Sequence, residues 1–200
     1  MKSVEANKLN TGNIILIGMM GSGKTTVGKL LAKQLHKDFV DCDEEIQRRT
    51  GVTIPHIFDV EGEAGFRIRE ASALEELMQR QNIVLATGGG VPLSEGNREL
   101  LKRGGVIVYL KSNVHDLWHR TRHDHNRPLL QTADPRATLQ VLYEKRDPIY
   151  NSIADIVIHT GKQNVQILLT KLQELIAEYQ SSNKSKSESL QYANIERRPS

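Results

Sequence analysis

The stretch Ile14-Ile15-Leu16-Ile17-Gly18-Met19-Met20-Gly21-Ser22-Gly23-Lys24-Thr25 decides the fold. Its last eight residues fit the pattern G-x-x-x-x-G-K-[ST], in which backbone N–H groups and a helix N-terminus surround a polyphosphate. The apolar run before the pattern is short enough for a buried strand, and residues 26–35 carry apolar residues at helical spacing. An ordinary tight turn could match the pattern by chance, but the strand and helix on its two sides favour a phosphate loop.

The residues of this loop have separate expected tasks. Lys24 is predicted to reach the β- and γ-phosphates of a nucleotide, and the Thr25 hydroxyl to ligate Mg²⁺. The expected ATP contacts within the loop and at the start of the helix come from Gly21, Ser22, Gly23, Lys24, Thr25 and Thr26.

Length and composition limit the other possibilities. A chain of 200 residues with 38% hydrophobic and 26% charged residues is typical of one globular domain. The single cysteine allows no internal disulfide, which favours a reducing compartment. No apolar stretch approaches the roughly 20 residues that span a bilayer, and residues 1–12 lack the apolar core of a signal peptide. We therefore expect a cytoplasmic protein with no membrane partner.

The positive charge of the chain does not indicate a nucleic-acid partner. Residues 1–12 carry a net charge of +1 and residues 181–200 a net charge of +2, which together account for the whole net charge of +3. Residues 13–180 are therefore formally neutral. Aromatic residues make up only 4% of the chain, so no platform for stacking bases is evident.

Short apolar runs alternate with helical patterns along the chain. Strands are predicted at 14–17, 38–41, 82–86, 106–110 and 155–159, and helices near 24–36, 43–50, 63–80, 95–103, 113–121, 135–146 and 164–179. This alternation predicts an α/β fold of three layers, α/β/α, with a central five-stranded parallel sheet. We expect an N-terminal extension at 1–12, one domain at 13–180, and a disordered C-terminal tail at 181–200, which is rich in Ser, Asn and Lys.

The segment 122–135 does not follow this alternation. It contains two prolines, many polar residues and no periodicity, and its length favours a functional lid over an ordinary connection. His123 and His125 within it could suggest a metal site, but solvated lid residues are the favoured interpretation.

The acidic residues favour transfer over hydrolysis. The apolar strands at 82–86 and 106–110 do not end in an acid, whereas the strand at 38–41 runs into Asp41-Cys42-Asp43. Both carboxylates could approach the phosphate loop, although Asp43 could also be a plain helix N-cap. Without an acid placed to activate water, and with a lid to exclude water, the pattern indicates phosphoryl transfer to an acceptor molecule.

Several separated motifs together resemble those of the shikimate kinase family. Besides the phosphate loop and Asp41-Cys42-Asp43, they are Gly62-Glu63 with Phe66-Arg67, Gly88-Gly89-Gly90, Arg127-Pro128-Leu129, and Lys145-Arg146-Asp147-Pro148-Ile149-Tyr150. The resemblance covers roughly residues 12–178. It implies a phosphate-loop fold of the nucleotide-kinase type, with ATP and shikimate as the small-molecule partners and Mg²⁺ as cofactor.

The resemblance implies an acceptor site built from Asp43, Arg67, Gly88, Gly89, Gly90 and Arg146. Two guanidinium groups, those of Arg67 and Arg146, would bind the shikimate carboxylate, because a planar fork matches a carboxylate. Asp43 would accept hydrogen bonds from the hydroxyls and act as the base. Taken from the residues alone, Arg67 could instead pair with Glu63 or Glu70, Arg146 could be a charge at a helix end, and the glycines could form a flexible turn.

The resemblance also implies the donor site. Arg127 would act on the γ-phosphate as a third catalytic residue beside Lys24 and Asp43. Arg120 would stack on adenine, with solvent-facing helix charge as its alternative, and Gln163 would lie on the other side of the base. Asp41 would hold Mg²⁺ through water, together with Thr25. Phe58 and Phe66 are expected to line the ring site or to pack in the core, and Trp118 is expected to be structural.

These implications lead to one preferred function. We expect ATP-dependent phosphorylation of shikimate to shikimate 3-phosphate, a step of chorismate and aromatic amino-acid biosynthesis, by a monomeric enzyme. The alternatives are a related small-molecule kinase, such as a gluconate or nucleotide kinase, and a non-enzymatic binding module. The binding module predicts the loss of at least one of Lys24, Asp43, Arg67, Arg127 and Arg146, and all of these are present.

Overall fold

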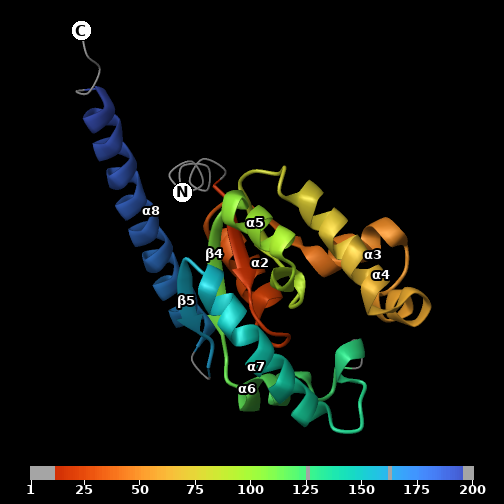
Figure 1. The fold of residues 1–200 in the computed structure, drawn as a ribbon. Coiled ribbons are helices and arrows are strands. Elements are labelled where there is room, and N and C mark those ends of the chain that lie inside the picture. The colour runs from red at the N-terminus through yellow and green to blue at the C-terminus, as the bar shows by residue number, and fades with distance from the viewer. Residues whose placement is uncertain (1–11, 125–126, 162–163, 196–200) are drawn as a thin grey trace.

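The computed structural model describes residues 12–124, 127–161 and 164–195, and of residues 184–195 it describes only the helical backbone. A central sheet lies between two layers of helices (Figure 1). The strands are β1 (Ile14–Ile17), β2 (Asp38–Asp41), β3 (Ile83–Ala86), β4 (Val106–Lys111) and β5 (Ile156–His159). The α-helices are α2 (Lys24–Gln34), α3 (Cys42–Thr50), α4 (Ile54–Leu77), α5 (Glu95–Gly104), α6 (Val114–Thr121), α7 (Pro135–Ile153) and α8 (Val165–Ile195). Two short 3₁₀ helices, η1 (Val91–Leu93) and η2 (Pro128–Leu130), complete them.

The sheet confirms the predicted fold class. Its strand order is β2-β3-β1-β4-β5, and every neighbouring pair is parallel. The phosphate-loop strand β1 is therefore central, and all four of its side chains are buried, as its uninterrupted apolar sequence requires. Because all strands point the same way, the residues that follow β1, β2 and β3 meet at one edge of the sheet.

Side-chain alternation along β1 divides the interior into two cores. Ile15 and Ile17 belong to the core that also contains buried residues of α3, α4, α5, α6 and α7. Ile14 and Leu16 point to the opposite face, where α2 and α8 cover the sheet. The three predicted layers follow from this alternation.

Helices α4 and α7 cover more residues than their sequence pattern predicts. Helix α4 begins at Ile54 behind the Thr53 cap and has a kink at Gly62, whose φ is 68°, so the predicted helix from residue 63 is its second part and the turns before the kink were not predicted. Helix α7 was predicted to end near residue 146, but it continues through Pro148 to Ile153. Burial of the last turn of α7 in the core offsets the backbone hydrogen bond that a proline removes.

Helix α8 continues to Ile195 and so includes most of the stretch predicted as a disordered C-terminal tail. The buried part of α8 packs on the sheet and supplies a formed helix from which further turns propagate. Residues 164–195 contain neither proline nor glycine, so no residue of this stretch stops the helix. Figure 1 shows the end of α8 projecting away from the sheet. Within the described residues, none of the helices has both the length and the apolar character needed to cross a membrane.

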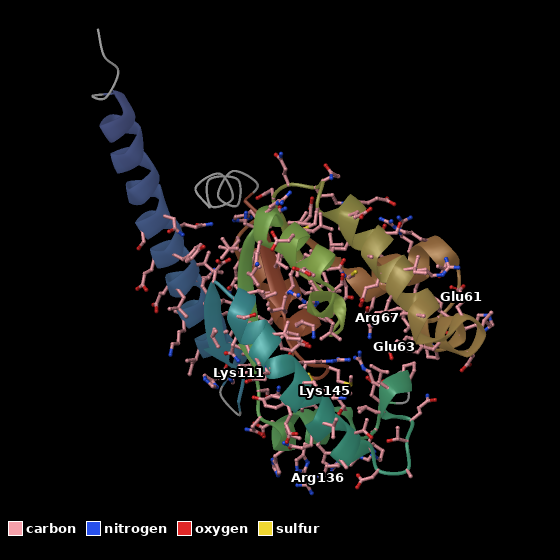
Figure 2. All side chains as sticks on the ribbon, in the orientation of Figure 1. Glu61, Glu63, Arg67, Lys111, Arg136 and Lys145 are labelled. Carbon is pink, nitrogen blue, oxygen red and sulfur yellow. The ribbon has the colours of Figure 1, made fainter. Side chains whose placement is uncertain are left out.

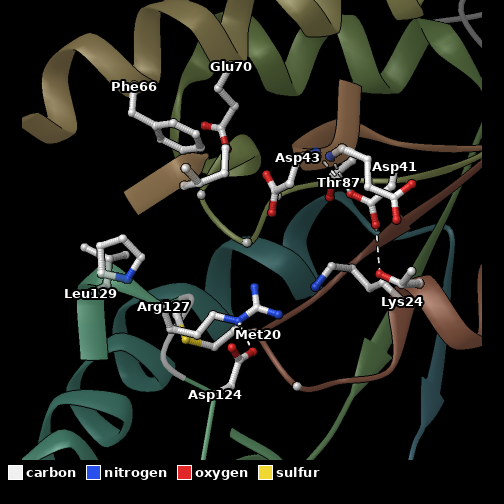
Figure 3. Close-up of a pocket in the computed structure, with 18 of the residues that line it drawn as sticks. Met20, Lys24, Asp41, Asp43, Phe66, Glu70, Thr87, Asp124, Arg127 and Leu129 are labelled. Atoms are coloured by element: carbon white, nitrogen blue, oxygen red, sulfur yellow. Dashed lines mark hydrogen bonds and ion pairs between the residues drawn. The ribbon is translucent and has the colours of Figure 1, made fainter. Parts of the chain in front are cut away.

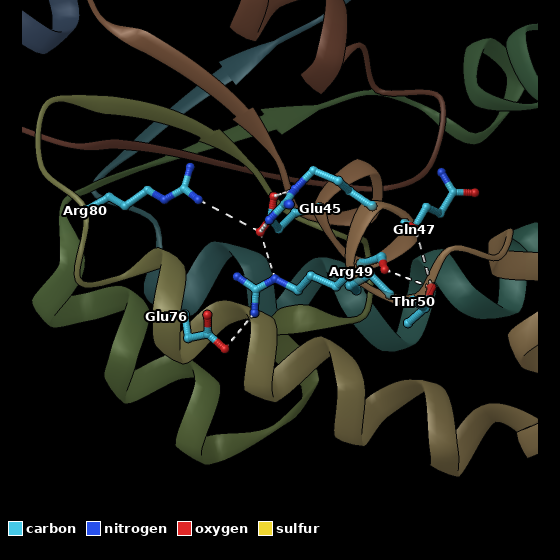
Figure 4. A network of polar contacts seen from close by, with 8 residues as sticks. Glu45, Gln47, Arg49, Thr50, Glu76 and Arg80 are labelled. Atoms are coloured by element: carbon cyan, nitrogen blue, oxygen red, sulfur yellow. Dashed lines mark hydrogen bonds and ion pairs between the residues drawn. The ribbon is translucent and has the colours of Figure 1, made fainter.

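A network around Glu45 fastens α3 to the end of α4 (Figure 4). The buried Glu45 carboxylate accepts hydrogen bonds from Arg48 and Arg49, at 2.7 Å each for the shortest contacts, and Arg49 also pairs with Glu76 at 2.8 Å. The hydrogen bonds from Arg48 are the main reason that the pKa of Glu45 falls to about 2. This network fixes the helix whose first turn enters the site described next.

Candidate active site

A cavity of about 750 Å³ lies beyond the carboxyl ends of β1, β2 and β3. Its lining comes from the phosphate loop, the first turn of α3, α4, the glycine triplet and the segment predicted as a lid (Figure 3). It contains most of the predicted site residues: Gly21, Gly23, Lys24, Thr25, Thr26, Asp41, Asp43, Arg67, Gly88, Gly89, Gly90, Arg120, Arg127 and Arg146. The fold thus brings the two predicted half-sites into one space.

The phosphate loop has the backbone conformation that its glycines allow. Gly23, at φ 96°, is the residue before α2, and Gly21, at φ 76°, lies so close to α6 that a Cβ would meet Thr121 Cγ2 at 2.6 Å. Lys24 Nζ donates to the carbonyl oxygens of Gly18 and Met19, at 2.9 Å each. Burial lowers the pKa of Lys24 to about 8, so the ammonium is short of compensating negative charge. An anionic ligand would supply that charge.

The two aspartates at the end of β2 differ in their roles from the alternative in which Asp43 is a plain helix N-cap. Asp41, and not Asp43, is the N-cap of α3: its Oδ1 accepts from the backbone N–H groups of Asp43 and Glu44. Its other oxygen, Oδ2, accepts a hydrogen bond of 2.8 Å from Thr25 Oγ1. The cap therefore points Asp41 at the hydroxyl of the phosphate loop and leaves Asp43 available for another task.

Asp43 is half-buried, but its Oδ1 is shielded from solvent and has no hydrogen-bond partner among the described residues. Burial raises the pKa of Asp43 above its usual value, and the neighbouring Asp41 carboxylate raises it further, whereas Lys24 and Arg127 oppose the rise. The raised pKa makes Asp43 a stronger base than an ordinary aspartate.

Arg67 both pairs with its own helix and faces the cavity. Its guanidinium contacts Glu63 at 2.7 Å and Glu70 at 2.8 Å, so the ion pairs considered as the alternative are present. Arg67 also lines the cavity, and Figure 2 shows it on the same side of α4 as Glu63. The buried Glu70 keeps one oxygen, Oε1, without a partner among the described residues. Its contact with Arg67 orients the guanidinium.

The glycine triplet makes room for charged side chains. A Cβ on Gly88 would come within 2.5 Å of Glu70 Oε1 and 2.9 Å of Asp43 Oδ1, and a Cβ on Gly90 would overlap the guanidinium of Arg67. The resemblance placed these glycines in the acceptor site. The structure gives a physical reason for them, since any side chain at Gly88 or Gly90 would displace the groups of the site.

Arg146 reaches the same place from α7. It is buried, its Nη1 lies 3.4 Å from the Gly89 carbonyl oxygen, and its Nε has no partner among the described residues. Tyr150, one turn later, donates a short hydrogen bond to the same carbonyl oxygen. Arg146 is therefore not a charge at a helix end, because α7 continues beyond it and buries it in the cavity wall.

The lid segment brings Arg127 into the cavity. Arg127 Nε donates to Asp124 at 2.9 Å, and the segment is tied to the core by the buried Leu130. In Figure 3 the guanidinium of Arg127 and the ammonium of Lys24 extend into the same part of the cavity. Two cations from separate segments thus converge there, which favours a ligand that carries several negative charges.

Three comparisons identify the family. The family model for shikimate kinase matches residues 20–177. The chain belongs to the shikimate kinase family. It is 56% identical to a shikimate kinase of Nitrosospira multiformis over 172 residues, which are 86% of this chain and 88% of that protein. A solved structure of the shikimate kinase from Acinetobacter baumannii in complex with shikimate is similar at a TM-score of 0.82 and 46% identity, covering 88% of this chain and 97% of the other.

A gluconokinase from Sinorhizobium meliloti has the same fold, with a TM-score of 0.53. Its sequence is only 19% identical, so this similarity concerns the fold and carries no argument about the acceptor. The alternative prediction of a gluconate kinase is thus supported by a shared fold and by nothing more specific.

Arg120 of this shikimate kinase-family chain is exposed, but it is more than a solvent-facing charge. Its guanidinium donates to the carbonyl oxygens of Gly21 at 3.2 Å, Thr160 at 3.3 Å and Gly161 at 3.0 Å. It therefore joins the phosphate loop to the segment after β5. Gln163, predicted for the same side of the donor site, lies outside the described residues, as does His125.

The remaining predicted residues, Phe58, Phe66, Ser22 and Trp118, lie in the cavity wall, under the phosphate loop or against the core. Phe58 and Phe66 line the cavity with ring centroids 4.8 Å apart, and both also pack against the core. Ser22 is buried, its Oγ has no partner among the described residues, and it lies below the loop surface. Trp118 packs against the core, as expected of a structural residue.

The sequence analysis missed two side chains that act on predicted site residues. Asp124 holds Arg127, and Tyr150 holds the Gly89 carbonyl oxygen that Arg146 also contacts. The spacing of one helical turn between Arg146 and Tyr150 was a signal for the second, since residues four apart on a helix share a face.

Proposed function

We propose that this chain transfers the γ-phosphoryl group of ATP to the 3-hydroxyl of shikimate, with Lys24, Asp43 and Arg127 as its catalytic residues. Membership in the shikimate kinase family supports the reaction. The observation that carries the assignment of residues is the solvent-shielded Oδ1 of Asp43, which has no partner among the described residues. Asp43 shares its cavity with the phosphate loop, Arg67 and Arg146.

The acceptor half is suited to a molecule that has a carboxylate and several hydroxyls. Arg67 and Arg146 offer two permanent positive charges with planar donor geometry, which matches a carboxylate. Asp43 accepts hydrogen bonds from hydroxyl groups, and its raised pKa favours uptake of the proton that the attacking hydroxyl releases. The Gly88-Gly89-Gly90 loop closes this half, and Phe58 and Phe66 offer an apolar wall to a carbon ring.

The donor half is suited to a nucleoside triphosphate. Residues 21–26 present backbone N–H groups at the start of α2, and Lys24 adds a cation beside them. Arg120 and Gln163 would contact the adenine. Arg127 would neutralise charge on the transferring phosphoryl group, which is the main contribution a protein makes to a loose transition state.

The residues at the loop fit a magnesium ion. The Thr25 hydroxyl and the Asp41 carboxylate are hard oxygen donors 2.8 Å apart, and Mg²⁺ prefers oxygen ligands and keeps several waters. Thr25 would bind the ion directly and Asp41 through water. Bound there, Mg²⁺ would supply positive charge next to the phosphates.

The lid would separate the reaction from water. Asp124, Arg127, Pro128 and Leu129 all line the cavity, so closure of this segment over a bound pair of substrates would exclude the competing nucleophile. Because every one of these groups comes from one chain, we also propose that the enzyme acts as a monomer. The single cysteine, which allows no internal disulfide, favours a reducing compartment, and we propose that the enzyme acts in the cytoplasm. Light scattering at assay concentration tests the first of these two proposals.

An acceptor assay tests the proposed reaction. ADP release is measured with shikimate, gluconate and nucleoside monophosphates at equal concentration, and the product is identified by phosphorus NMR. Turnover with shikimate and a product phosphorylated at the 3-hydroxyl are expected. Turnover with gluconate or a nucleotide alone would reject the proposal in favour of the related kinases.

A further inference from the structure

Two histidines on α6 face each other outside the cavity. His115 and His119 are one helical turn apart, and their Nε2 atoms are 3.2 Å from each other. Their rings are 4.4 Å apart between centroids and inclined by 61°. Neither residue lines the cavity of the active site. The proposed phosphoryl transfer assigns them no task.

The spacing of these two nitrogens is that of a metal chelate. A zinc–imidazole bond is about 2.0–2.1 Å long, so two such bonds at a tetrahedral angle place the nitrogens about 3.3 Å apart. We propose that His115 and His119 form a binding site for a transition-metal cation, of the class of Zn²⁺, Ni²⁺ and Cu²⁺. The observed separation needs only a small adjustment to admit the ion.

The carboxylate of Asp116 lies next to the ring nitrogen of His115 that would not bind the metal. Asp116 Oδ1 lies 3.5 Å from His115 Nδ1, and Asn113 fixes Asp116 from two sides: its Oδ1 accepts from the Asp116 N–H, and its Nδ2 donates to the carboxylate. A carboxylate at Nδ1 favours the tautomer that leaves Nε2 free to bind a metal, and such partners raise the basicity of ligating histidines. The arrangement therefore orients His115 for ligation.

The chemistry of the ligands selects the class of cation. Imidazole nitrogen suits zinc, nickel and copper, whereas Mg²⁺ prefers oxygen and is expected at Thr25 and Asp41 instead. The described residues hold no cluster of three or more His, Cys, Asp or Glu side chains suited to a metal, so the site has two protein ligands and takes the others from water. The side chain of His115 is 61% exposed, which leaves room for that water.

Metal binding at this place would stabilise the helix that carries Arg120. Helix α6 has only eight residues, and helices of this length are marginal by themselves. Its last turn contains Arg120, which contacts three carbonyl oxygens, and Thr121, which packs on Gly21 of the phosphate loop. A cation that joins His115 to His119 closes this turn from outside and holds it helical.

Calorimetry with ZnCl₂ and, separately, CuCl₂ tests the site on the full chain without an affinity tag. One site is expected, with tighter binding of Cu²⁺ than of Zn²⁺. His115→Gln and His119→Gln should each weaken binding at least ~10-fold, and Asp116→Asn should weaken it on the order of 10-fold. The matched control is His123→Gln, which lies just beyond the end of α6 and whose Nε2 accepts from Arg122 Nε. Its affinity should stay within about twofold of the wild type. Equal binding by the wild type and His119→Gln, or a loss confined to His123→Gln, would overturn the proposal.

Hydrogen exchange gives a readout that is independent of activity. In the absence of nucleotide, saturating ZnCl₂ should slow exchange of the α6 amides in the wild type and leave it unchanged in His119→Gln. Slowing in both proteins would assign the effect to another zinc site. Zinc binding without any slowing of α6 in the wild type would reject the stabilisation of this helix.

Discussion

Removal of the Arg67 side chain separates its role in binding from its role in folding. The Glu70 side chain is only 1% exposed and takes its 2.8 Å ion pair from Arg67, whose own side chain is 25% exposed. Removing one partner of a buried pair costs about 3–5 kcal/mol. Because Arg67 is partly solvated, Arg67→Ala should cost less, about 2–3 kcal/mol of the free energy of unfolding. Protonation of Glu70, whose pKa burial already raises, limits this cost.

The binding effect has a different size and origin. Hydrogen bonds to a charged group contribute about 1.5–3 kcal/mol each, which corresponds to roughly 10- to 100-fold in affinity. Arg67→Ala should therefore raise the Kd for shikimate by that factor and leave the Kd for ATP close to the wild-type value. Equilibrium urea unfolding and calorimetric titration of each substrate measure the two effects.

Two further variants make the test decisive. Arg69→Ala is the matched control, because Arg69 lies on the same helix and pairs at 2.6 Å with the more exposed Glu61; neither quantity should change appreciably. The double variant Arg67→Ala/Glu70→Gln removes the stranded carboxylate. It should recover much of the stability without recovering shikimate affinity. Recovery of both would show that Arg67 acts only through the fold, which would refute the reasoning.

Three more perturbations follow from the site. Asp43→Asn should lower kcat at least ~100-fold. Since burial raises the pKa of Asp43, the wild-type kcat should fall as the pH drops through that raised pKa, and the pH–rate profile of the variant should lack this decrease in acid. Tyr150→Phe removes the hydrogen bond to the Gly89 carbonyl oxygen and should raise KM for shikimate about 3- to 10-fold with KM for ATP unchanged. Tyr179→Phe, remote from the cavity, is the control. Parallel changes in KM for shikimate and KM for ATP in Tyr150→Phe would argue for a general structural defect. Glu45→Gln should lower stability at neutral pH, because folding lowers the pKa of Glu45 from its ordinary value to about 2. The contribution of Glu45 is full above the ordinary pKa of a glutamate and is lost as the pH falls toward 2, so wild-type and variant unfolding curves should converge in acid; a constant difference would exclude this cause.

The phosphate loop shows how far local sequence reaches. The residues from Ile14 to Thr25 specify a strand, a glycine turn and a helix start within one short segment, so their pattern alone predicted the central strand and the anion site. The same holds for the other strands, whose apolar runs gave their positions to within one residue at each end.

The ends of helices were less predictable. Helix α7 was predicted to end near residue 146, but Tyr150 and Ile153 are buried in the core and carry α7 past Pro148. Likewise, the cap of α3 could be assigned to Asp41 or Asp43 from sequence, and only the structure shows which carboxylate turns back to the backbone. Contacts with distant parts of the chain decide such boundaries.

The sequence by itself determined the α/β fold, the nucleotide loop and, through the resemblance of its motifs, the residues that gather at the site. Only the tertiary structure decided the properties of those residues: the raised pKa of Asp43, the support of Arg67 by Glu70, and the space that Gly88 and Gly90 leave for both. The physical reason is that strand and helix patterns are properties of neighbouring residues. Burial and electrostatic fields are instead sums over groups from β2, β3, α4 and the lid, which are far apart in the chain.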